Sequence, residues 1–394
     1  MTLKTYGGVT IGSLTKKSAI VGVAESECGV VPHRTPLELI AQATKKALDD
    51  AGLAKNEINA LFNAGLPMMS TVQLGEYLQI EPRYTDTTQT GGASFEMHVQ
   101  HATAAIATGL CHTALICYGS TQHSDRQRRL PSTWIIDPKS PSSQFDRPFG
   151  SWLIANYALA AQRHFYQYGT TPQQLAEIAV ATRKWAAMNP IAMMRDLITI
   201  DDVLASPTIS SPLHLLDCCL VTDGGGAIII TSPERARDTR KPPVWILGCG
   251  ESHTHASITN MPDLTITPAK QSGEAAFAMA GLSTTDIDVV ELYDSFSITV
   301  LMQLEDLGFC QKGEGGDFVS GQRTAPGGDF PMNTNGGGLS FTHTGMYGIF
   351  LLIEAVRQLR NECGDRQVPK ARTALCNGIG GSLSSSSTVI LGRD

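Results

Sequence analysis

Two stretches of sequence decide the fold, TPLELIAQATKKALDDAGL at residues 35–53 and TPAKQSGEAAFAMAGL at residues 267–282. Each begins with Thr-Pro, which is typical of a helix N-cap followed by the first helical residue. Each ends with Ala-Gly-Leu, where glycine suits the left-handed position that closes a helix. Polar residues then lead into Glu57-Ile58-Asn59 in one stretch and Asp286-Ile287-Asp288 in the other. We interpret the two stretches as copies of one unit.

Further pairs of segments support a duplication. Residues 113–119, TALICYG, resemble residues 373–378, TALCNG, and the glycine-led apolar run at 223–230 resembles the C-terminal run at 380–391. The alternative is that two unrelated units share common capping chemistry. Short apolar runs alternate with amphipathic segments in both halves, which predicts a mixed α/β fold with buried sheets. The expected strands are 18–23, 114–117, 244–247 and 374–376, and the expected helices include 35–51, 95–108 and 348–359.

The repeat also predicts the domain organisation. We expect an N-terminal half over residues 1–242 and a C-terminal half over residues 243–394. Residues from 121 to about 206 have no counterpart in the second copy, so they are expected to form an insertion in the first half. A helix from about 152 to 168 is expected within that insertion.

Composition excludes several classes of protein. The 394 residues carry 42% hydrophobic residues and a formal net charge of −7, which argues against a nucleic-acid-binding surface. Nine scattered cysteines indicate a reducing compartment, and the apolar runs are too short for a membrane span, so we expect a cytoplasmic protein. His98 and His101 lie three apart, but the chain lacks CxxC and HExxH motifs, and we expect no metal site. It also lacks the glycine-rich motifs typical of ATP and NAD sites.

Four C-terminal motifs carry a family resemblance: ELYDSF at 291–296, NTNGGG at 333–338, His343, and CNG at 376–378. Together with the repeat they resemble the thiolase superfamily, and most closely its sterol-carrier-protein or lipid-transfer-protein branch. The resemblance implies a duplicated five-layer α/β/α/β/α sandwich with an inserted loop domain and at least a dimeric molecule. It also implies a coenzyme A thioester as substrate, with no cofactor beyond the coenzyme A that the substrate carries.

The sequence departs from the family where a thiolase has its nucleophilic cysteine. The corresponding stretch at residues 90–96, TGGASFE, contains none. Ser94 could act as a nucleophile if a base lay beside it, or it could simply be a helix N-cap. Without the acyl-carrying sulfur, a Claisen condensation through an acyl-enzyme is disfavoured. Retro-aldol cleavage needs enolate stabilisation but no covalent intermediate, and it fits the residues that are present.

Thiolase-like aldolases that shorten steroid side chains are similar in lacking this cysteine. The resemblance implies that Tyr293 and Tyr347 are acid/base groups, that His343 polarises the thioester carbonyl, and that Cys376 matches the family's second cysteine. Each also has a simpler reading, as a core aromatic, a pocket residue or a small buried thiol. Asp294 could orient a neighbour or cap a helix.

Further residues are expected to contact the substrate: Ser94, His253, Gly337, Gly338 and Asn377. The resemblance also implies a homodimer joined by an OB-fold, zinc-ribbon subunit in a heterotetramer. We therefore expect a lyase of lipid metabolism, in steroid degradation, that cleaves a bulky β-hydroxyacyl-CoA to a ketone or aldehyde and a shortened acyl-CoA. The alternatives are an acyltransferase of the acetyl-CoA acetyltransferase type, using Ser94 or a displaced cysteine, and a non-catalytic acyl-CoA- or lipid-binding subunit.

Overall fold

A computed structural model describes residues 5–6, 9–10, 14–66, 69–128, 139, 141–150 and 152–394. A short hairpin, β1 (Thr5–Tyr6) and β2 (Val9–Thr10), precedes the main fold. The larger sheet of the described chain has the strand order β11-β12-β13-β10-β3-β9-β6-β4-β5. Strands β10 and β3 pair only where Val244 and Trp245 meet Ile20 and Ala19, so each half of the chain contributes its own set of strands.

The strand order of the first half is repeated in the second. In the first half, β3 (Ala19–Glu25) pairs with β9 (Gly224–Thr231), β9 with β6 (Thr113–Ser120), and β6 with β4 (Ala60–Asn63), while β5 (Tyr84–Asp86) forms the edge. In the second, β10 (Val244–His253) pairs with β13 (Ser385–Gly392), β13 with β12 (Thr373–Gly380), and β12 with β11 (Val289–Leu292). The repeated order is what the sequence repeat predicts.

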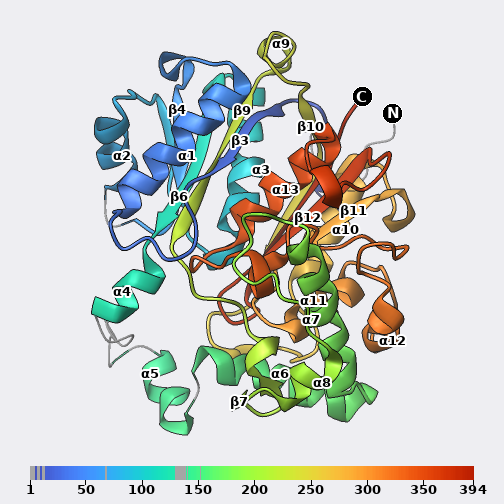
Figure 1. Ribbon diagram of the computed structural model, residues 1–394. Coiled ribbons are helices and arrows are strands. Elements are labelled where there is room, and N and C mark those ends of the chain that lie inside the picture. Colours follow the sequence, from blue (N-terminus) through green and yellow to red (C-terminus); the bar gives the residue numbers. More distant parts are fainter. Residues whose placement is uncertain are drawn as a thin grey trace.

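Helices cover both outer faces and fill the middle. On one outer face lie α1 (Pro36–Ala51) and α2 (Ser70–Leu78), and on the other lies α10 (Ala269–Ala280). Between the two sets of strands lie α3 (Ser94–Ala107) and α13 (Gly348–Arg360), each of which packs on strands of both halves. Figure 1 shows these layers in turn, from α1 through the central helices to α10. The predicted five-layer sandwich is confirmed.

The ends of the two repeated helices follow from their caps. Thr35 accepts a hydrogen bond from the Glu38 N–H and forms a capping box with that residue. Gly52 and Gly281 both adopt the left-handed conformation, with φ values of 70° and 69°. The second helix differs at its start, because Thr267 donates to the Asp306 carboxylate and Pro268 takes the N-cap position.

The segment between β6 and β9 carries a group of helices: α4 (Gln122–Arg128), α5 (Pro141–Phe145), α6 (Leu153–Tyr168), α7 (Pro172–Ala187) and α8 (Ile200–Ala205). The hairpin β7 (Thr208–Ser210) and β8 (Leu213–His214) follows α8 before β9 begins. Part of the expected insertion lies outside the described residues. The boundaries at 121, 206 and 242 stay predictions.

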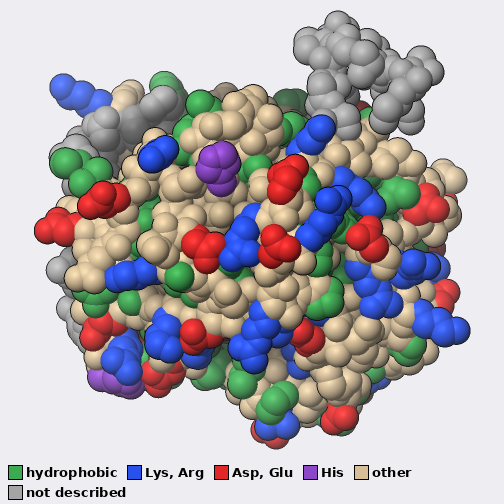
Figure 2. Space-filling view, turned by 90° about the horizontal axis from the view of Figure 1, so that it is seen from above, with side chains coloured by type: hydrophobic (Ala, Val, Ile, Leu, Met, Phe, Trp, Pro, Cys, Tyr) green, Lys and Arg blue, Asp and Glu red, His purple; other side chains and the backbone are tan. Residues whose placement is uncertain are grey.

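The remaining α-helices of the described chain are α9 (Pro233–Ala236), α11 (Ser297–Asp306) and α12 (Gly315–Val319), and Gly337–Phe341 forms a π-helical turn. On the face seen in Figure 2, Lys and Arg side chains alternate with Asp and Glu side chains. Within the described residues, no helix combines the length and apolar character needed to cross a bilayer.

Candidate functional site

Tyr293 and His343 form the centre of the candidate site. The Tyr293 hydroxyl lies 3.0 Å from His343 Nε2, and it also accepts a hydrogen bond from the Tyr347 backbone N–H at 3.2 Å. With the ring proton of His343 on Nδ1, the Tyr293 phenol donates to Nε2 while its oxygen accepts the Tyr347 N–H. The Tyr293 and His343 rings meet edge to face at 87°, with 4% and 8% of the residues exposed. The two side chains form a nearly dry proton-transfer pair.

A polar network behind β11 and β12 holds Tyr293 in place. Its backbone N–H donates to the Asn377 carbonyl, and its own carbonyl accepts from the Gln303 side chain. The Asn377 amide in turn donates to Gln303 and accepts from Ser386 and Thr388. Asn377 was expected to contact the substrate, but its side-chain contacts are with this network rather than with the Tyr293–His343 pair.

Asp294 builds the turn that faces His343. Its carboxylate accepts the backbone N–H groups of Gly338 at 2.6 Å and Leu339 at 3.1 Å, at the start of the π-helical turn. A Cβ on Gly337 would overlap the Asp294 carboxylate, and one on Gly338 would lie 3.1 Å from His343 Cδ2. Burial raises the pKa of Asp294 to about 6, although the two N–H groups act in the opposite direction. The capping interpretation of Asp294 fits these contacts.

Tyr347 stands beside the pair, but its hydroxyl points elsewhere. The phenol donates to Asn335 Oδ1 at 2.8 Å, while the ring lies nearly parallel to the His343 ring at 14°. Its contact with Tyr293 is made by its backbone N–H. The structure therefore brings Tyr293, His343 and Tyr347 together and gives the two phenols different partners.

Burial keeps the phenols and the thiol of this region neutral. It raises the pKa of Tyr293 and of Tyr347 well above the ordinary value for tyrosine, and the charges of Asp294 and Glu291 add to the effect at Tyr347. Burial also raises the pKa of Cys376, whose Sγ donates to the Leu351 carbonyl at 3.6 Å. Tyr293 therefore works as a base only if its own proton moves on, and His343 Nε2 is placed to accept it.

Comparisons with known proteins agree with this geometry. Residues 250–393 match the family model described as "Thiolase C-terminal domain-like". The acetyl-CoA acetyltransferase of Methanothermobacter thermautotrophicus is 30% identical, over 95% of this chain and 99% of that protein. The chain belongs to the thiolase superfamily. Within it, the chain is one of the members that resemble the sterol-carrier-protein thiolases.

Lyases of the thiolase superfamily are also similar to this chain. The 17-hydroxy-3-oxo-4-pregnene-20-carboxyl-CoA lyase of Mycobacterium tuberculosis is 34% identical, over 88% of this chain and 92% of that protein. The solved structure described as "Ltp2-ChsH2(DUF35) aldolase" superposes with a TM-score of 0.88 at 31% identity, covering 97% of this chain and 99% of that one. The chain is similar to both proteins over nearly its whole length.

Ser94 lies in the stretch at residues 90–96 where a thiolase is expected to carry its nucleophilic cysteine. The N-cap interpretation of Ser94 is wrong, because α3 begins at Ser94 and Ala93 is the N-cap. The Ser94 hydroxyl donates to the Gly91 carbonyl at 2.7 Å and accepts from the Thr90 N–H at 2.9 Å. Both contacts are with backbone, so they supply no side-chain base to activate the hydroxyl.

His253 lies apart from the Tyr293–His343 pair. It is exposed at the end of β10, and its Nδ1 lies 3.0 Å from the Ser385 hydroxyl. We expect His253→Ala to change the KM for an acyl-CoA substrate by no more than about twofold, about 0.4 kcal/mol of binding, because His253 is not bonded to the Tyr293–His343 pair. Steady-state kinetics measure this directly. A tenfold rise in KM would instead support the predicted contact with substrate.

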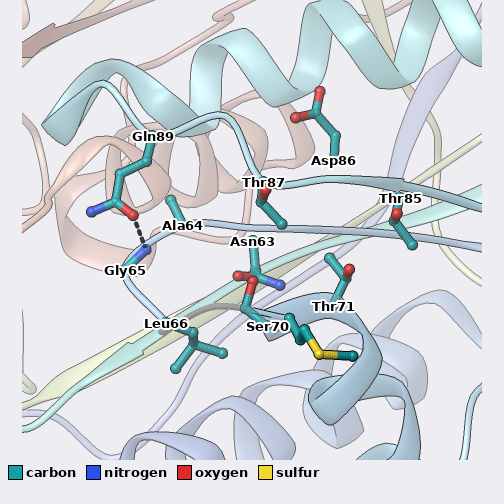
Figure 3. Close-up of a pocket in the computed structure, with 11 residues that line it drawn as sticks. Asn63, Ala64, Gly65, Leu66, Ser70, Thr71, Thr85, Asp86, Thr87 and Gln89 are labelled. Atoms are coloured by element: carbon teal, nitrogen blue, oxygen red, sulfur yellow. Dashed lines mark hydrogen bonds between the residues drawn. The ribbon is translucent and has the colours of Figure 1, made fainter.

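A polar cavity that the sequence did not reveal lies next to the site. It has a volume of about 390 Å³ and opens at the ends of β4 and β5, lined by Asn63, Ala64, Gly65, Leu66, Met69, Ser70, Thr71, Thr85, Asp86, Thr87 and Gln89. In Figure 3, the Asn63 amide lies between Ser70 and Thr71 on one side and Thr87 on the other. The cavity adjoins the site where Gly65 approaches Met346 and Tyr118, but none of its lining residues belongs to the Tyr293–His343 pair.

Glu96 is a second feature that sequence reasoning missed. It is fully buried in the first turn of α3, and its carboxyl group lies against Gly348 and Gly378, next to predicted site residues. The available signal was a charged residue directly between the apolar residues Phe95 and Met97, near the start of a helix. The described residues contain no group of three or more His, Cys, Asp or Glu side chains that could hold a metal ion.

Proposed function

We propose that the protein is a carbon–carbon lyase that cleaves a bulky β-hydroxyacyl-CoA of the steroid side-chain type. The products are a ketone or aldehyde and a shortened acyl-CoA. The observation that carries this proposal is the 3.0 Å contact of the Tyr293 hydroxyl with His343, in a chain without a cysteine at the start of α3. The names of two similar proteins, a carboxyl-CoA lyase and an aldolase, support it.

The first step removes the proton of the β-hydroxyl group. Tyr293 accepts that proton as its own phenol proton passes to His343 Nε2, so no free phenolate is formed in a buried site. The Cα–Cβ bond then breaks, the β-carbon becomes a carbonyl carbon, and the electron pair moves into the thioester as an enolate. General acid–base catalysis of this kind contributes about 10² to 10⁴ in rate.

The second step returns the proton. The imidazolium of His343 gives its proton back to Tyr293, and the phenol proton goes to the α-carbon of the enolate. Atoms and charges balance, and the enzyme is regenerated without a covalent intermediate. We assign Asp294, Gly337 and Gly338 to holding the turn that faces His343, and Tyr347 to fixing the Tyr293 hydroxyl through its N–H. Acid/base roles for Tyr347 and Cys376 stay predictions.

The proposal includes a partner. The solved aldolase structure carries two names, Ltp2 and ChsH2(DUF35), which supports a second subunit here. We propose a homodimer of this chain joined by two copies of an OB-fold, zinc-ribbon subunit, acting in the cytoplasm on an acyl-CoA. Beyond the coenzyme A of the substrate, the proposed reaction uses no cofactor.

The test is cleavage by protein purified from its native host, so that a bound partner copurifies. We expect a steroid acyl-CoA with a hydroxyl on the carbon β to the thioester to give a ketone and a shortened acyl-CoA, both measured by mass spectrometry. The matched control substrate is the same acyl-CoA without the hydroxyl, which cannot be cleaved by this route. Failure of protein and copurified partner to cleave several bulky hydroxyacyl-CoA substrates contradicts the proposal.

An acyltransferase is the second candidate, favoured by the similar acetyl-CoA acetyltransferase and by Cys219. Cys219 is partly exposed, and it lies close enough to Tyr293 to add, after burial, to the electrostatic effects that raise the pKa of that phenol. This candidate predicts an acyl adduct on Cys219 or Ser94, visible by intact mass after incubation with acetyl-CoA. The lyase predicts an unchanged mass.

A further inference from the structure

Glu96 carries a buried carboxyl group that no other described residue binds. Its exposed fraction is 0%, and neither carboxylate oxygen has a hydrogen-bond partner among the described residues. Other buried carboxylates near the site are paired, as Glu354 is with Arg366 and Asp294 is with two backbone N–H groups. Leaving a buried polar group unpaired costs free energy, so such a group in a native fold needs an explanation.

Two glycines from different elements make room for this carboxyl group. A Cβ on Gly378 of β12 would overlap Glu96 Oε2, and one on Gly348 would lie 2.5 Å from Oε2 and 2.8 Å from Oε1. Any larger residue at either position would have to displace the carboxyl group or move the backbone. The slot is therefore shaped around Glu96, at the point where β12 and the start of α13 meet α3.

The other side of this slot is the Tyr293 site. A Cβ on Gly92 would overlap the Tyr293 ring, and the Gly92 carbonyl lies against the same face of Gly348 as Glu96 does. Gly348 directly follows Tyr347, whose N–H binds the Tyr293 hydroxyl. Glu96 thus lies immediately behind the backbone that positions the proposed acid/base pair.

We propose that Glu96 is a positioning residue of the lyase reaction, an inference that rests on the proposed function. The uncharged acid fills the glycine slot behind Tyr293. The carboxylate form would destabilise the enolate that forms on the substrate. A negative charge buried without a partner is screened little by its surroundings. It therefore disfavours the negative charge that develops on the thioester during carbon–carbon cleavage. Glu96 need not touch the substrate for this effect.

Four titratable groups of other elements face the first turns of α3. They are Tyr118 of β6, Tyr293 after β11, Tyr347 before α13 and Cys376 of β12. Burial raises the pKa of all four, so they stay neutral at mildly alkaline pH. On α3 itself, burial lowers the pKa of His98 to about 4, whereas His101, paired with Asp86 and with Glu251 of β10, has a pKa raised to about 9. Glu291 of β11 is buried and bonded to Thr334, and burial raises its pKa.

Burial raises the pKa of Glu96 to about 8, so the pH dependence of kcat is the readout. We expect wild-type kcat for hydroxyacyl-CoA cleavage to fall tenfold for each pH unit above about 8 as one proton is lost. Glu96→Gln, which stays neutral, should lower kcat at pH 7 only a few-fold and move the falling limb up by more than one pH unit. Glu76→Gln, at an exposed carboxyl on α2, should keep the wild-type profile. An unmoved limb in Glu96→Gln overturns the proposal.

Thermal stability tests the same group without any substrate. The pKa of Glu96 is raised by folding, so its contribution to stability is complete below pH 4.5, is lost as pH rises toward about 8, and is constant above that. We expect the melting temperature of wild type to fall relative to Glu96→Gln between pH 5 and pH 8. A difference independent of pH overturns the proposal. If wild type cleaves no hydroxyacyl-CoA, the proposed function fails, and the role of Glu96 in that reaction fails with it. A pH-dependent difference in melting temperature between wild type and Glu96→Gln would still identify Glu96 as a buried neutral acid.

Discussion

Replacing Tyr293 by Phe is expected to lower kcat for hydroxyacyl-CoA cleavage by about 10³-fold, within the range of general acid–base catalysis. The change removes the hydroxyl that lies 3.0 Å from His343 Nε2 and leaves the ring that packs on Gly92. Binding should change little, because the ring still fills the same space. Single-turnover kinetics measure the chemical step, and titration calorimetry with a non-hydroxylated acyl-CoA measures binding.

Two matched variants show whether the loss belongs to this hydroxyl. Tyr347→Phe removes a phenol bonded to Asn335 and keeps the N–H that binds Tyr293, so kcat should fall by about tenfold, the effect of one lost hydrogen bond. Tyr166→Phe, at a residue 82% exposed, should leave kcat unchanged. If Tyr293→Phe retains kcat within fivefold of wild type, the relay through His343 is wrong. In a non-catalytic binding subunit, the three variants would show no turnover and the same affinity as wild type.

The repeated part of the fold could be predicted from local chemistry. The Thr-Pro starts and Gly ends at residues 35–52 and 267–281 depend on contacts within one helical turn, which a sequence displays directly. Even here a contact between distant residues is added to the local one, because the Thr267 hydroxyl donates to Asp306 while it accepts the Ala269 N–H at the start of α10. The sequence repeat predicts that the two halves share one strand order, but it does not say what that order is.

The site could be predicted only in part, because the direction of a side chain depends on distant segments. Tyr293 and His343 were expected in the site, and they meet across 50 residues of sequence. Asn377 was expected there too, but Gln303, Ser386 and Thr388 satisfy its amide behind the sheet. Glu96 was missed for the complementary reason: nothing in residues 90–96 shows that β12 and α13 close over it.

Gly92→Ala is expected to affect both stability and turnover, because the turn before α3 has no room for a methyl group. A Cβ there would overlap two carbons of the Tyr293 ring and lie 2.5 Å from the Ile379 carbonyl oxygen. Overpacking of this kind costs about 1–3 kcal/mol of unfolding free energy. The added methyl group should also push the Tyr293 hydroxyl away from His343 Nε2, and a displacement of about 1 Å at this contact is expected to lower kcat by about 10²-fold. Denaturant unfolding and cleavage kinetics measure the two effects separately.

Two controls identify the cause of the effects of Gly92→Ala. The variant Gly109→Ala measures backbone strain without crowding, and the double variant Gly92→Ala with Tyr293→Phe tests whether the loss of kcat acts through the Tyr293 hydroxyl. Gly109 has a φ of 77°, and a Cβ added there would meet nothing within 4 Å, so Gly109→Ala should cost about 1 kcal/mol from the left-handed backbone alone and leave kcat unchanged. If Gly92→Ala acts by displacing the Tyr293 hydroxyl, it should cause little further loss of kcat once Tyr293→Phe has removed that hydroxyl, while the stability cost persists because the ring carbons remain. Fully multiplicative losses of kcat would mean that the turn at Gly92 serves the reaction through some group other than Tyr293.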